Sequence, residues 1–211
     1  MPYFWQKELF LFTAVFCFKR SHMELLEERI KKDGVVLPGD VLKVNSFLNH
    51  QIDPQLMMTL GQEFARLFKD AGVTRVLTAE ASGIAPGIMA AYCLGVPMIF
   101  ARKKKPSTVT DAVYTAEVFS YTKQVTNTIS VEAKFLDAND RILVIDDFLA
   151  NGEAAKGLIS LAEQAGAEVV GVGVVVEKAF QGGHDWLVNH GYHLEALASI
   201  KKFADGQVIF N

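Results

Sequence analysis

The feature that most constrains the fold is an alternation of short, almost wholly apolar runs with segments of helical periodicity. The apolar runs occupy residues 73–79, 96–101, 141–145 and 169–176. The helical segments, in which apolar residues recur every three or four positions, occupy residues 54–71, 83–95 and 153–165. Runs that are apolar on both faces are typical of parallel strands covered by helices on both sides. The pattern therefore predicts an α/β fold with a mostly parallel, twisted sheet and helices on both faces.

The composition fits one globular domain and excludes several classes of protein. The chain has 211 residues, 50% of them hydrophobic, so it can bury a sizeable core without a disulfide or a structural metal. Cys17 and Cys93 have neither metal-ligand nor disulfide-framework spacing, which predicts a reducing compartment, the cytoplasm. The formal net charge of −3 gives no general attraction to nucleic acid or to an anionic membrane. Any affinity for phosphate must therefore come from a local site.

Residues 1–22 differ in character from the rest of the chain. They contain an apolar run at residues 9–18, whereas a membrane span takes roughly 20 residues. A secretory signal needs a cationic start and a small-residue cleavage site, but here one lysine precedes the run and Lys19 and Arg20 follow it. Because Met23 opens an amphipathic helix, we expect residues 23–211 to form the functional domain and residues 1–22 to be a non-native or mis-assigned extension. The alternative is a hydrophobic arm that packs on a partner subunit.

The stretch at residues 142–157 carries the clearest chemistry. An apolar strand delivers two adjacent carboxylates, Asp146 and Asp147, to its carboxyl end, where open α/β sheets bind ligands. A small-residue loop then enters a helix, whose N-terminal backbone N–H groups can hold a phosphate. The residues expected at that phosphate are Ala150, Asn151, Gly152, Glu153 and Ala154. Since carboxylates repel phosphate, the acidic pair is expected to serve sugar hydroxyls, Mg²⁺ or a positive charge, unless it is only a strand-capping turn.

The acidic pair and the phosphate loop together indicate a phosphorylated sugar whose reacting carbon becomes cationic. The apolar strand, the two acids and the loop resemble the phosphoribosyl-pyrophosphate signature of the type I phosphoribosyltransferases. Many members of that family have Thr-Gly-Gly-Thr in the loop, whereas this chain has Ala-Asn-Gly-Glu-Ala, which leaves more of the binding to backbone amides and Asn151. This form is similar to the bacterial members that use xanthine, and the likeness covers residues 23–211.

The resemblance implies a type I phosphoribosyltransferase fold with a small N-terminal hood, and an activity in purine salvage. Xanthine and phosphoribosyl pyrophosphate would give xanthosine monophosphate and pyrophosphate, with Mg²⁺ held mainly by the pyrophosphate of the substrate. Asp146 and Asp147 would be the catalytic pair, which binds the ribose hydroxyls and stabilises the cationic transition state, with one of them handling the purine proton. The resemblance also implies a homodimer, and we expect no nucleic-acid or membrane partner.

A second strand-to-helix junction, at residues 80–86, faces the same edge of the sheet. By the resemblance, Ala81, Ser82 and Gly83 form the pyrophosphate loop; from the residues alone, a Ser-Gly capping turn is an open alternative. A run of cations opens a long excursion at residues 102–127, which we expect to be mobile, partly hairpin and able to close over the site. We take Lys103 as the candidate for neutralising the leaving pyrophosphate, but the sequence does not tell which lysine of the run does so; the alternative for the whole run is a solvated face.

Residues from both ends of the chain are expected to recognise the base. Lys178 and Phe180 follow an apolar run, where a lysine donor and an aromatic face would suit an oxopurine. The resemblance adds Leu42 and Asn49 from the hood, with Asn49 donating to the second carbonyl of xanthine. The residues alone would instead make Leu42 a core residue and Asn49 a turn residue.

Three alternative functions stay open on the sequence. A transferase for guanine, hypoxanthine or adenine would differ only in its base contacts. A non-enzymatic purine-sensing regulator of the same fold would need a DNA-binding module, for which there is no pattern. A nicotinamide dehydrogenase would need Gly-x-Gly-x-x-Gly after the first strand, and the chain lacks it there. The five histidines have no metal-ligand spacing, and we expect them to be structural, and Cys93 to be a buried small hydrophobe.

Overall fold

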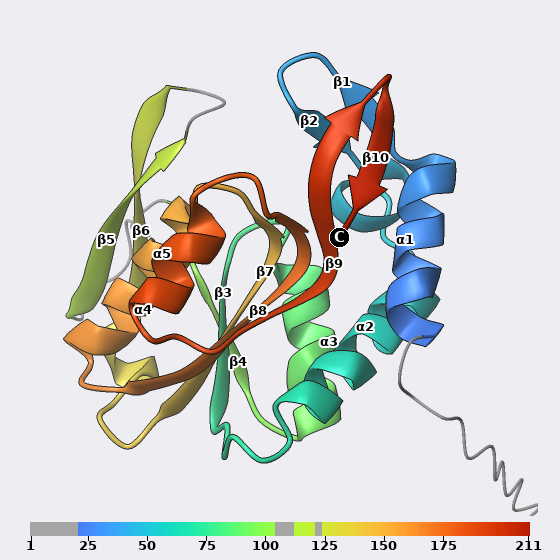
Figure 1. Cartoon of the computed structure of the whole chain (residues 1–211). Helices are drawn as coiled ribbons and strands as arrows, with labels where there is room; N and C mark the ends of the chain where they lie inside the picture. Colours follow the sequence, from blue (N-terminus) through green and yellow to red (C-terminus); the bar gives the residue numbers. More distant parts are fainter. Residues whose placement is uncertain (1–20, 104–111, 121–123) are drawn as a thin grey trace, which may run out of the picture.

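A six-stranded sheet forms the centre of the molecule (Figure 1), whose computed structural model describes residues 21–103, 112–120 and 124–211. The strand order is β10-β9-β8-β7-β3-β4. The strands are β3 (Arg75–Ala79), β4 (Met98–Ala101), β7 (Arg141–Leu149), β8 (Glu168–Lys178), β9 (Leu194–Ala204) and β10 (Gln207–Phe210). Neighbouring strands are parallel except for the pair of β9 and β10. The predicted α/β fold with a mostly parallel sheet is therefore confirmed.

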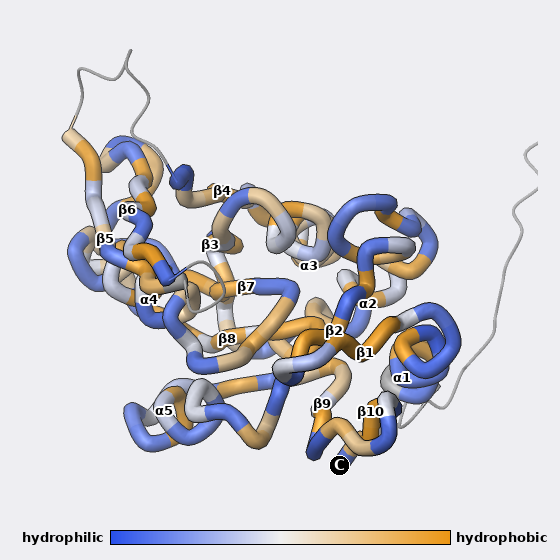
Figure 2. The backbone as a smooth tube through the Cα atoms, turned by 90° about the horizontal axis from the view of Figure 1, so that it is seen from above, coloured by the Kyte–Doolittle hydropathy of each residue, from blue (hydrophilic) through white to orange (hydrophobic). Residues whose placement is uncertain are grey.

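Helices cover both faces of this sheet, as the apolar runs predict. On one face pack α2 (Pro54–Leu67) and α3 (Ile84–Leu94), and on the other α4 (Glu153–Gln164) and α5 (Gly183–Asn189). In β7, Leu143 and Ile145 join the α2–α3 core, whereas Ile142 and Val144 join the α4 core. Figure 2 shows that β8 is likewise mostly hydrophobic. Burial on both faces leaves the strand ends as the places where polar loops can gather.

Local signals set the ends of the helices. The Asp53 side chain accepts two backbone N–H groups of the first turn of α2 at 3.1 Å each, as its place before proline predicts. The helix ends at Leu67, short of the expected Gly72, because Phe68 leaves the helical conformation and buries its ring in the core. α3 ends at Gly95, whose φ of +72° is the left-handed cap that glycine favours. Among the described residues, no helix is long and apolar enough to span a membrane.

The N-terminal part of the described chain forms a small hood beside β9 and β10 (Figure 1). It consists of α1 (Ser21–Asp33), β1 (Val35–Leu37), β2 (Val41–Lys43) and a π-helix, η1 (Asn45–Asn49). Leu26 and Ile30 anchor α1 because both side chains are fully buried in the core shared with α2 and α3. The expected hood is therefore present. Residues 1–20 lie outside the described ranges, so the assignment of residues 1–22 as an extension stays a prediction.

The long excursion is for the most part a regular antiparallel hairpin. It is formed by β5 (Val113–Ser120) and β6 (Val125–Glu132), which are followed by a 3-10 turn, η2 (Ala133–Phe135). The expectation of an excursion that is only partly hairpin and ends at residue 127 is corrected, because Ile129 and Val131 are buried and extend β6. The hairpin packs along α4. Lys104 and Lys105 of the cation run lie outside the described residues.

Candidate active site

A cavity of about 540 Å³ opens at the carboxyl ends of β3, β7 and β8, and residues of the hood and of the hairpin also line it. The sheet supplies most of its lining, from residues 79–83, residues 146–155 and Lys178. The hood adds residues 39–41. The hairpin adds Val118, Phe119, Asn127 and Ile129. The cavity lies where open α/β sheets bind their ligands, as the sequence predicts.

The acidic pair lines this cavity from within β7, which continues beyond it to Leu149. Asp146 is buried, and its Oδ1 accepts the backbone N–H of Asp147 at 2.9 Å. Burial raises the pKa of Asp146 well above its ordinary value, and the charge of Asp147 raises it further, whereas the cation of Lys103 opposes the shift. Burial also raises the pKa of Asp147, against hydrogen bonds that include one from Asn49. Such a pair can accept a proton more readily than exposed aspartates do.

The loop expected to hold phosphate, residues 150–154, lines the cavity over its whole length. Gly152 allows its sharp turn into α4, because its φ of +82° is strained for residues with a Cβ. Within the described ranges no side chain caps the start of α4, so its first backbone N–H groups can receive an anion. Gly183 of α5 supports the loop by donating its N–H to the Ala150 carbonyl at 2.9 Å. A Cβ on Gly183 would lie 2.5 Å from that oxygen, so glycine permits this close approach.

The second expected loop, which contains Ala81, Ser82 and Gly83, lies against the acidic pair and lines the same cavity. A Cβ on Gly83 would lie 3.1 Å from Asp146 Oδ1 and 2.1 Å from Thr78 Oγ1, so this backbone approaches the aspartate closely. The preceding Glu80–Ala81 peptide bond is cis. Glu80 also ties the loop to the start of the excursion, since its Oε1 accepts the backbone N–H of Lys103 at 2.7 Å.

Lys178, the expected base contact, lies at the cavity with its amine directed to the hood. Its Nζ donates to the backbone carbonyl of Asp40 at 2.7 Å, and Asp40 is itself a lining residue. Burial lowers the pKa of Lys178, while the negative charge of Asp40 opposes that shift. The contact therefore connects the end of β8 to the β1–β2 turn.

The other residues expected at the base lie outside the lining of the cavity. Leu42 is buried in the core and does not line the cavity. Phe180 does not line it either, because its ring packs edge-on against Phe203 at 5.7 Å and stays 41% exposed. Asn49, at the end of the π-helix, is also outside the cavity lining, but it lies close enough to Asp147 to lower the pKa of that carboxyl. Its Oδ1 is buried without a hydrogen-bond partner among the described residues.

The sequence did not indicate several of the residues that line the cavity. Those from the hood are Gly39, Asp40 and Val41, and Gln181 follows β8. Those from the hairpin are Val118, Phe119, Asn127 and Ile129. No local pattern marks them, because they reach the cavity through the packing of distant segments. The glycine pair at residues 182–183 could have indicated that the chain after β8 approaches another backbone closely, as Gly183 does at Ala150.

The donor set at the cavity suits a hard cation better than a soft one. Asp146 and Asp147 offer carboxylate oxygens, the ligand type that Mg²⁺ prefers. In the described part of the chain, no group of three or more His, Cys, Asp or Glu side chains is arranged to hold a metal. Asp40, Glu80 and Glu153 also line the cavity, but Asp146 and Asp147 are the adjacent pair that we expect to face Mg²⁺, with most of its ligands left to substrate and water.

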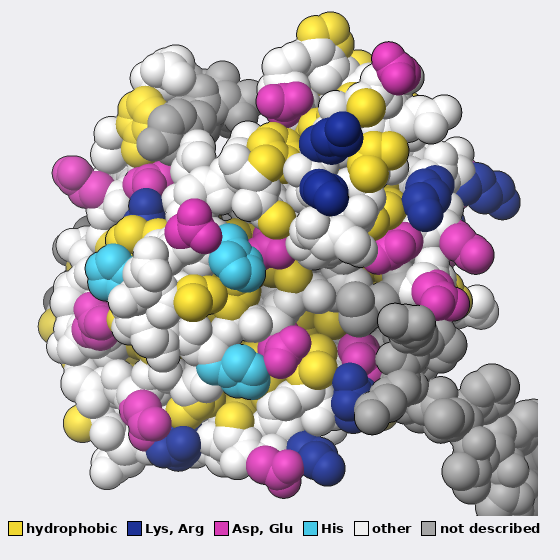
Figure 3. Space-filling model, in the orientation of Figure 1, with side chains coloured by type: hydrophobic (Ala, Val, Ile, Leu, Met, Phe, Trp, Pro, Cys, Tyr) yellow, Lys and Arg dark blue, Asp and Glu magenta, His cyan; other side chains and the backbone are white. Residues whose placement is uncertain are grey.

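Histidine and cysteine side chains outside the cavity have structural surroundings. Figure 3 shows histidines beside acidic side chains on one face of the molecule. His184 Nδ1 lies 2.5 Å from Glu177 Oε1, and His193 Nε2 lies 2.9 Å from Glu195 Oε1. Cys93, expected to be buried, is a half-buried free thiol on α3, and burial raises its pKa.

The sequence is similar to enzymes named xanthine phosphoribosyltransferase. The relative from Lactobacillus delbrueckii subsp. bulgaricus is 98% identical over 189 residues, which are 90% of this chain and 100% of the relative. The relative from Lactobacillus gasseri is 69% identical over 188 residues, 89% of this chain and 98% of the relative. A scan against protein-family models found no match.

Solved structures of adenine phosphoribosyltransferases share the fold. The enzyme from Trypanosoma brucei, in complex with AMP, pyrophosphate and ribose-5-phosphate, has a TM-score of 0.70 at 20% identity, covering 86% of this chain and 83% of that one. The enzyme from Rhodothermus marinus has a TM-score of 0.68 at 24% identity, covering 84% and 99%. At these identities the likeness shows the type I phosphoribosyltransferase fold, and the implied fold is confirmed.

Proposed function

Since this chain belongs to the xanthine phosphoribosyltransferase family, we propose that it makes xanthosine monophosphate and pyrophosphate from xanthine and phosphoribosyl pyrophosphate. At the level of the site, the observation that carries the proposal is that one cavity is lined by the acidic pair, the two backbone-rich loops and Lys178 together. These parts match the ribose, the two phosphate groups and the base of the reacting molecules.

The reaction replaces one bond at the anomeric carbon of the ribose. A ring nitrogen of xanthine bonds to that carbon, the bond from the carbon to the pyrophosphate oxygen breaks, and the nitrogen loses its proton. Asp146 lies deeper and suits the ribose hydroxyls and the positive charge that develops on the sugar. Asp147 is more accessible, so a base in the cavity can reach it, and its raised pKa also suits it to accept the purine proton.

The two loops hold the phosphates at opposite ends of the sugar. Residues 150–154 take the 5′-phosphate through backbone N–H groups at the start of α4, and residues 81–83 take the pyrophosphate beside Asp146. Lys103 follows β4 and offsets the negative charge at the acidic pair, so its cation can also neutralise the departing pyrophosphate. Mg²⁺ on the pyrophosphate, next to Asp146 and Asp147, would supply further neutralisation of the leaving group.

Lys178 is the residue that best fits base recognition. Its amine already donates to a carbonyl, that of Asp40, so a purine carbonyl can take the place of that acceptor at the same donor. Asn49, beside Asp147, would donate its amide N–H to the second carbonyl of xanthine from the edge of the hood. Leu42 then shapes the hood from within its core.

A homodimer in the cytoplasm completes the proposal. The family resemblance supports the dimer, and α3 exposes two large apolar side chains one turn apart, Ile88 at 45% and Tyr92 at 73%. Sedimentation of the pure protein tests this assembly, and a stable, active monomer would reject it. The reduced Cys93 fits a reducing compartment.

Nucleotide formation by the full chain tests the activity directly. The assay supplies phosphoribosyl pyrophosphate, Mg²⁺ and, in separate reactions, xanthine, guanine, hypoxanthine or adenine. Strong preference for xanthine is the expected result. Preference for another purine would overturn the base assignment but keep the sugar and phosphate assignments. Tight binding of phosphoribosyl pyrophosphate without turnover of any purine would instead favour a purine-sensing regulator.

A further inference from the structure

The phosphate loop contains a charge that opposes its proposed ligand. Glu153 is the first residue of α4 and lines the cavity, where its carboxylate would repel a phosphate held at the same helix start. The loop has no cation of its own between residues 150 and 154. An anion site built this way needs a partner that cancels the charge of Glu153.

Lys156 is that partner in the structure. Its Nζ lies 2.7 Å from Glu153 Oε1, one turn along α4. Its backbone N–H donates to the Gly152 carbonyl at 2.8 Å, and its Cε lies 3.7 Å from where a Cβ on Gly152 would be. The Lys156 side chain therefore folds back over the loop instead of extending into solvent.

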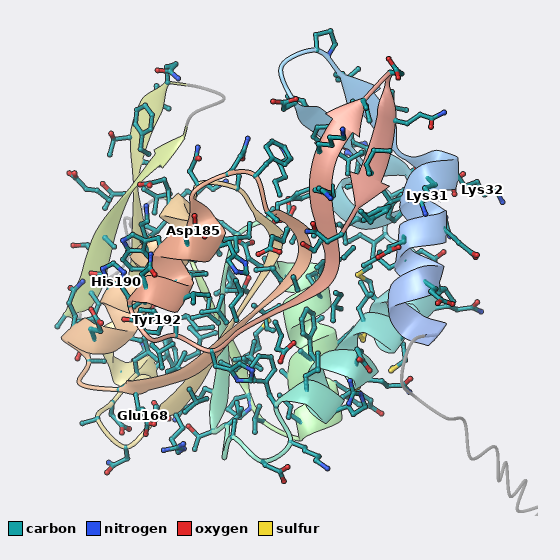
Figure 4. All side chains as sticks on the ribbon, viewed as in Figure 1. Lys31, Lys32, Glu168, Asp185, His190 and Tyr192 are labelled. Atoms are coloured by element: carbon teal, nitrogen blue, oxygen red, sulfur yellow. The ribbon has the colours of Figure 1, made fainter. Side chains whose placement is uncertain are left out.

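An aromatic support holds Lys156 in this position. Its Nζ lies 5.3 Å from the ring centre of Trp186 on α5, a distance typical of a cation–π contact. Trp186 stacks in turn on His190, with ring centres 4.1 Å apart, and on Tyr192, with ring centres 6.1 Å apart. Figure 4 shows His190 and Tyr192 close to α5. This support limits the ways in which Lys156 can turn away from Glu153.

We propose that Lys156 is a positioning residue for the 5′-phosphate of phosphoribosyl pyrophosphate, acting by neutralising Glu153 at the mouth of the phosphate loop. The inference rests on the proposed function, because it takes residues 150–154 as the 5′-phosphate site. The pair is only partly buried, and an ion pair that water reaches contributes little to stability. Next to a phosphate dianion the same pair matters for binding, since loss of the lysine leaves two like charges together.

Four variants separate this role from a structural one: K156Q, E153Q, the double variant E153Q/K156Q, and K69Q as a charge-matched control. Gln removes the charge of Lys156 and keeps the first two of its four methylene groups. Lys69 is exposed at 68% and lies on the α2–β3 connection, outside the cavity lining. Calorimetry measures the affinity for phosphoribosyl pyrophosphate, and steady-state assays measure KM and kcat for both substrates. Thermal melting verifies that each variant folds.

We expect K156Q to weaken phosphoribosyl pyrophosphate binding roughly tenfold, as for the loss of one charge-assisted contact, with xanthine KM and kcat within about twofold. E153Q should bind as well as the parent or better, and E153Q/K156Q should recover most of the loss, because no uncompensated carboxylate remains. Unchanged affinity in K156Q, or a double variant as weak as K156Q, would overturn the proposal. Calorimetry tests the role of Lys156 in binding even if the enzyme does not turn over. If the proposed function is wrong, the parent itself will form no nucleotide.

Discussion

The phosphate side and the base side of the cavity differ in how their residues are assembled. On the phosphate side, residues 81–83 and 150–154 belong to two strand–loop–helix junctions, and every one of them lines the cavity. On the base side, Lys178 lines it, whereas Leu42, Asn49 and Phe180 do not. A loop that leaves a buried strand and enters a helix has little freedom, because both of its ends are fixed by the core. Side chains brought in by separate elements depend on how those elements pack.

Asp147→Asn should give the largest effect, because it removes the proposed proton acceptor that both sides share. We expect turnover to fall by roughly 10²–10⁴, the usual contribution of a general acid or base. The measurement is kcat for xanthosine monophosphate formation, with calorimetric binding of phosphoribosyl pyrophosphate to show that the phosphate side is intact. An unchanged kcat would remove Asp147 from catalysis.

Lys178→Ala should affect the base side alone. The loss of a hydrogen bond from a charged donor should weaken xanthine binding by about 1.5–3 kcal/mol. Affinity for phosphoribosyl pyrophosphate should stay as in the parent, and Lys201→Ala, an exposed lysine on β9, serves as the control. Equal losses for both substrates would mean that Lys178 supports the whole cavity and that the two sides are not independent.

Asp146→Asn should stabilise the protein in a pH-dependent way while impairing turnover. Because burial raises the pKa of Asp146, the folded state binds its proton more tightly than the unfolded chain does. This tighter proton binding stabilises the folded state fully below the ordinary pKa of 3.8, and the stabilisation is lost as the pH rises through the raised pKa of the folded state. Asparagine cannot ionise, so the variant should have a higher melting temperature than the parent at pH 8, by about 2–4 °C for each kcal/mol of added unfolding free energy. This difference in melting temperature should shrink towards pH 4.

Thermal melting of parent and variant at several pH values measures this gap. Asp70→Asn, at an aspartate whose side chain is 90% exposed, is the control and should show no such pH-dependent gap. A gap for Asp146→Asn that stays constant with pH would contradict the explanation by burial.

Phe180→Ala should give the smallest effect. The Phe180 ring packs on Phe203 and lies off the cavity lining, so we expect xanthine affinity to change by less than about twofold, well below the roughly 1–3 kcal/mol of a lost base-stacking contact. Xanthine KM and calorimetric affinity measure the change. A tenfold loss would mean that Phe180 does stack on the base, and that the base side rearranges when the base binds.

Predictions from the sequence were correct where a feature depends on neighbouring residues and incorrect where it depends on the packing of distant segments. The α2 cap at Asp53, the strand with Asp146 and Asp147, and the turn at Gly152 were predictable, because each depends on neighbours within a few residues. The hairpin was underestimated, because the strand character of residues 125–132 comes from packing on α4 and the edge of β4. Phe180 could not be placed from sequence, because it lies in the turn after β8 and its partner Phe203 lies far along the chain in β9.

The sequence by itself determined the parallel sheet and the two loops at its carboxyl edge, since strand burial, glycine turns and helix starts are local properties. The tertiary structure alone decided which distant groups complete the cavity: the Asp40 carbonyl on Lys178, Asn49 on Asp147, and Gly183 against Ala150. The physical reason is that these contacts join segments far apart along the chain. Their geometry depends on the packing of the hood and α5 against the sheet, which no local pattern of residues encodes.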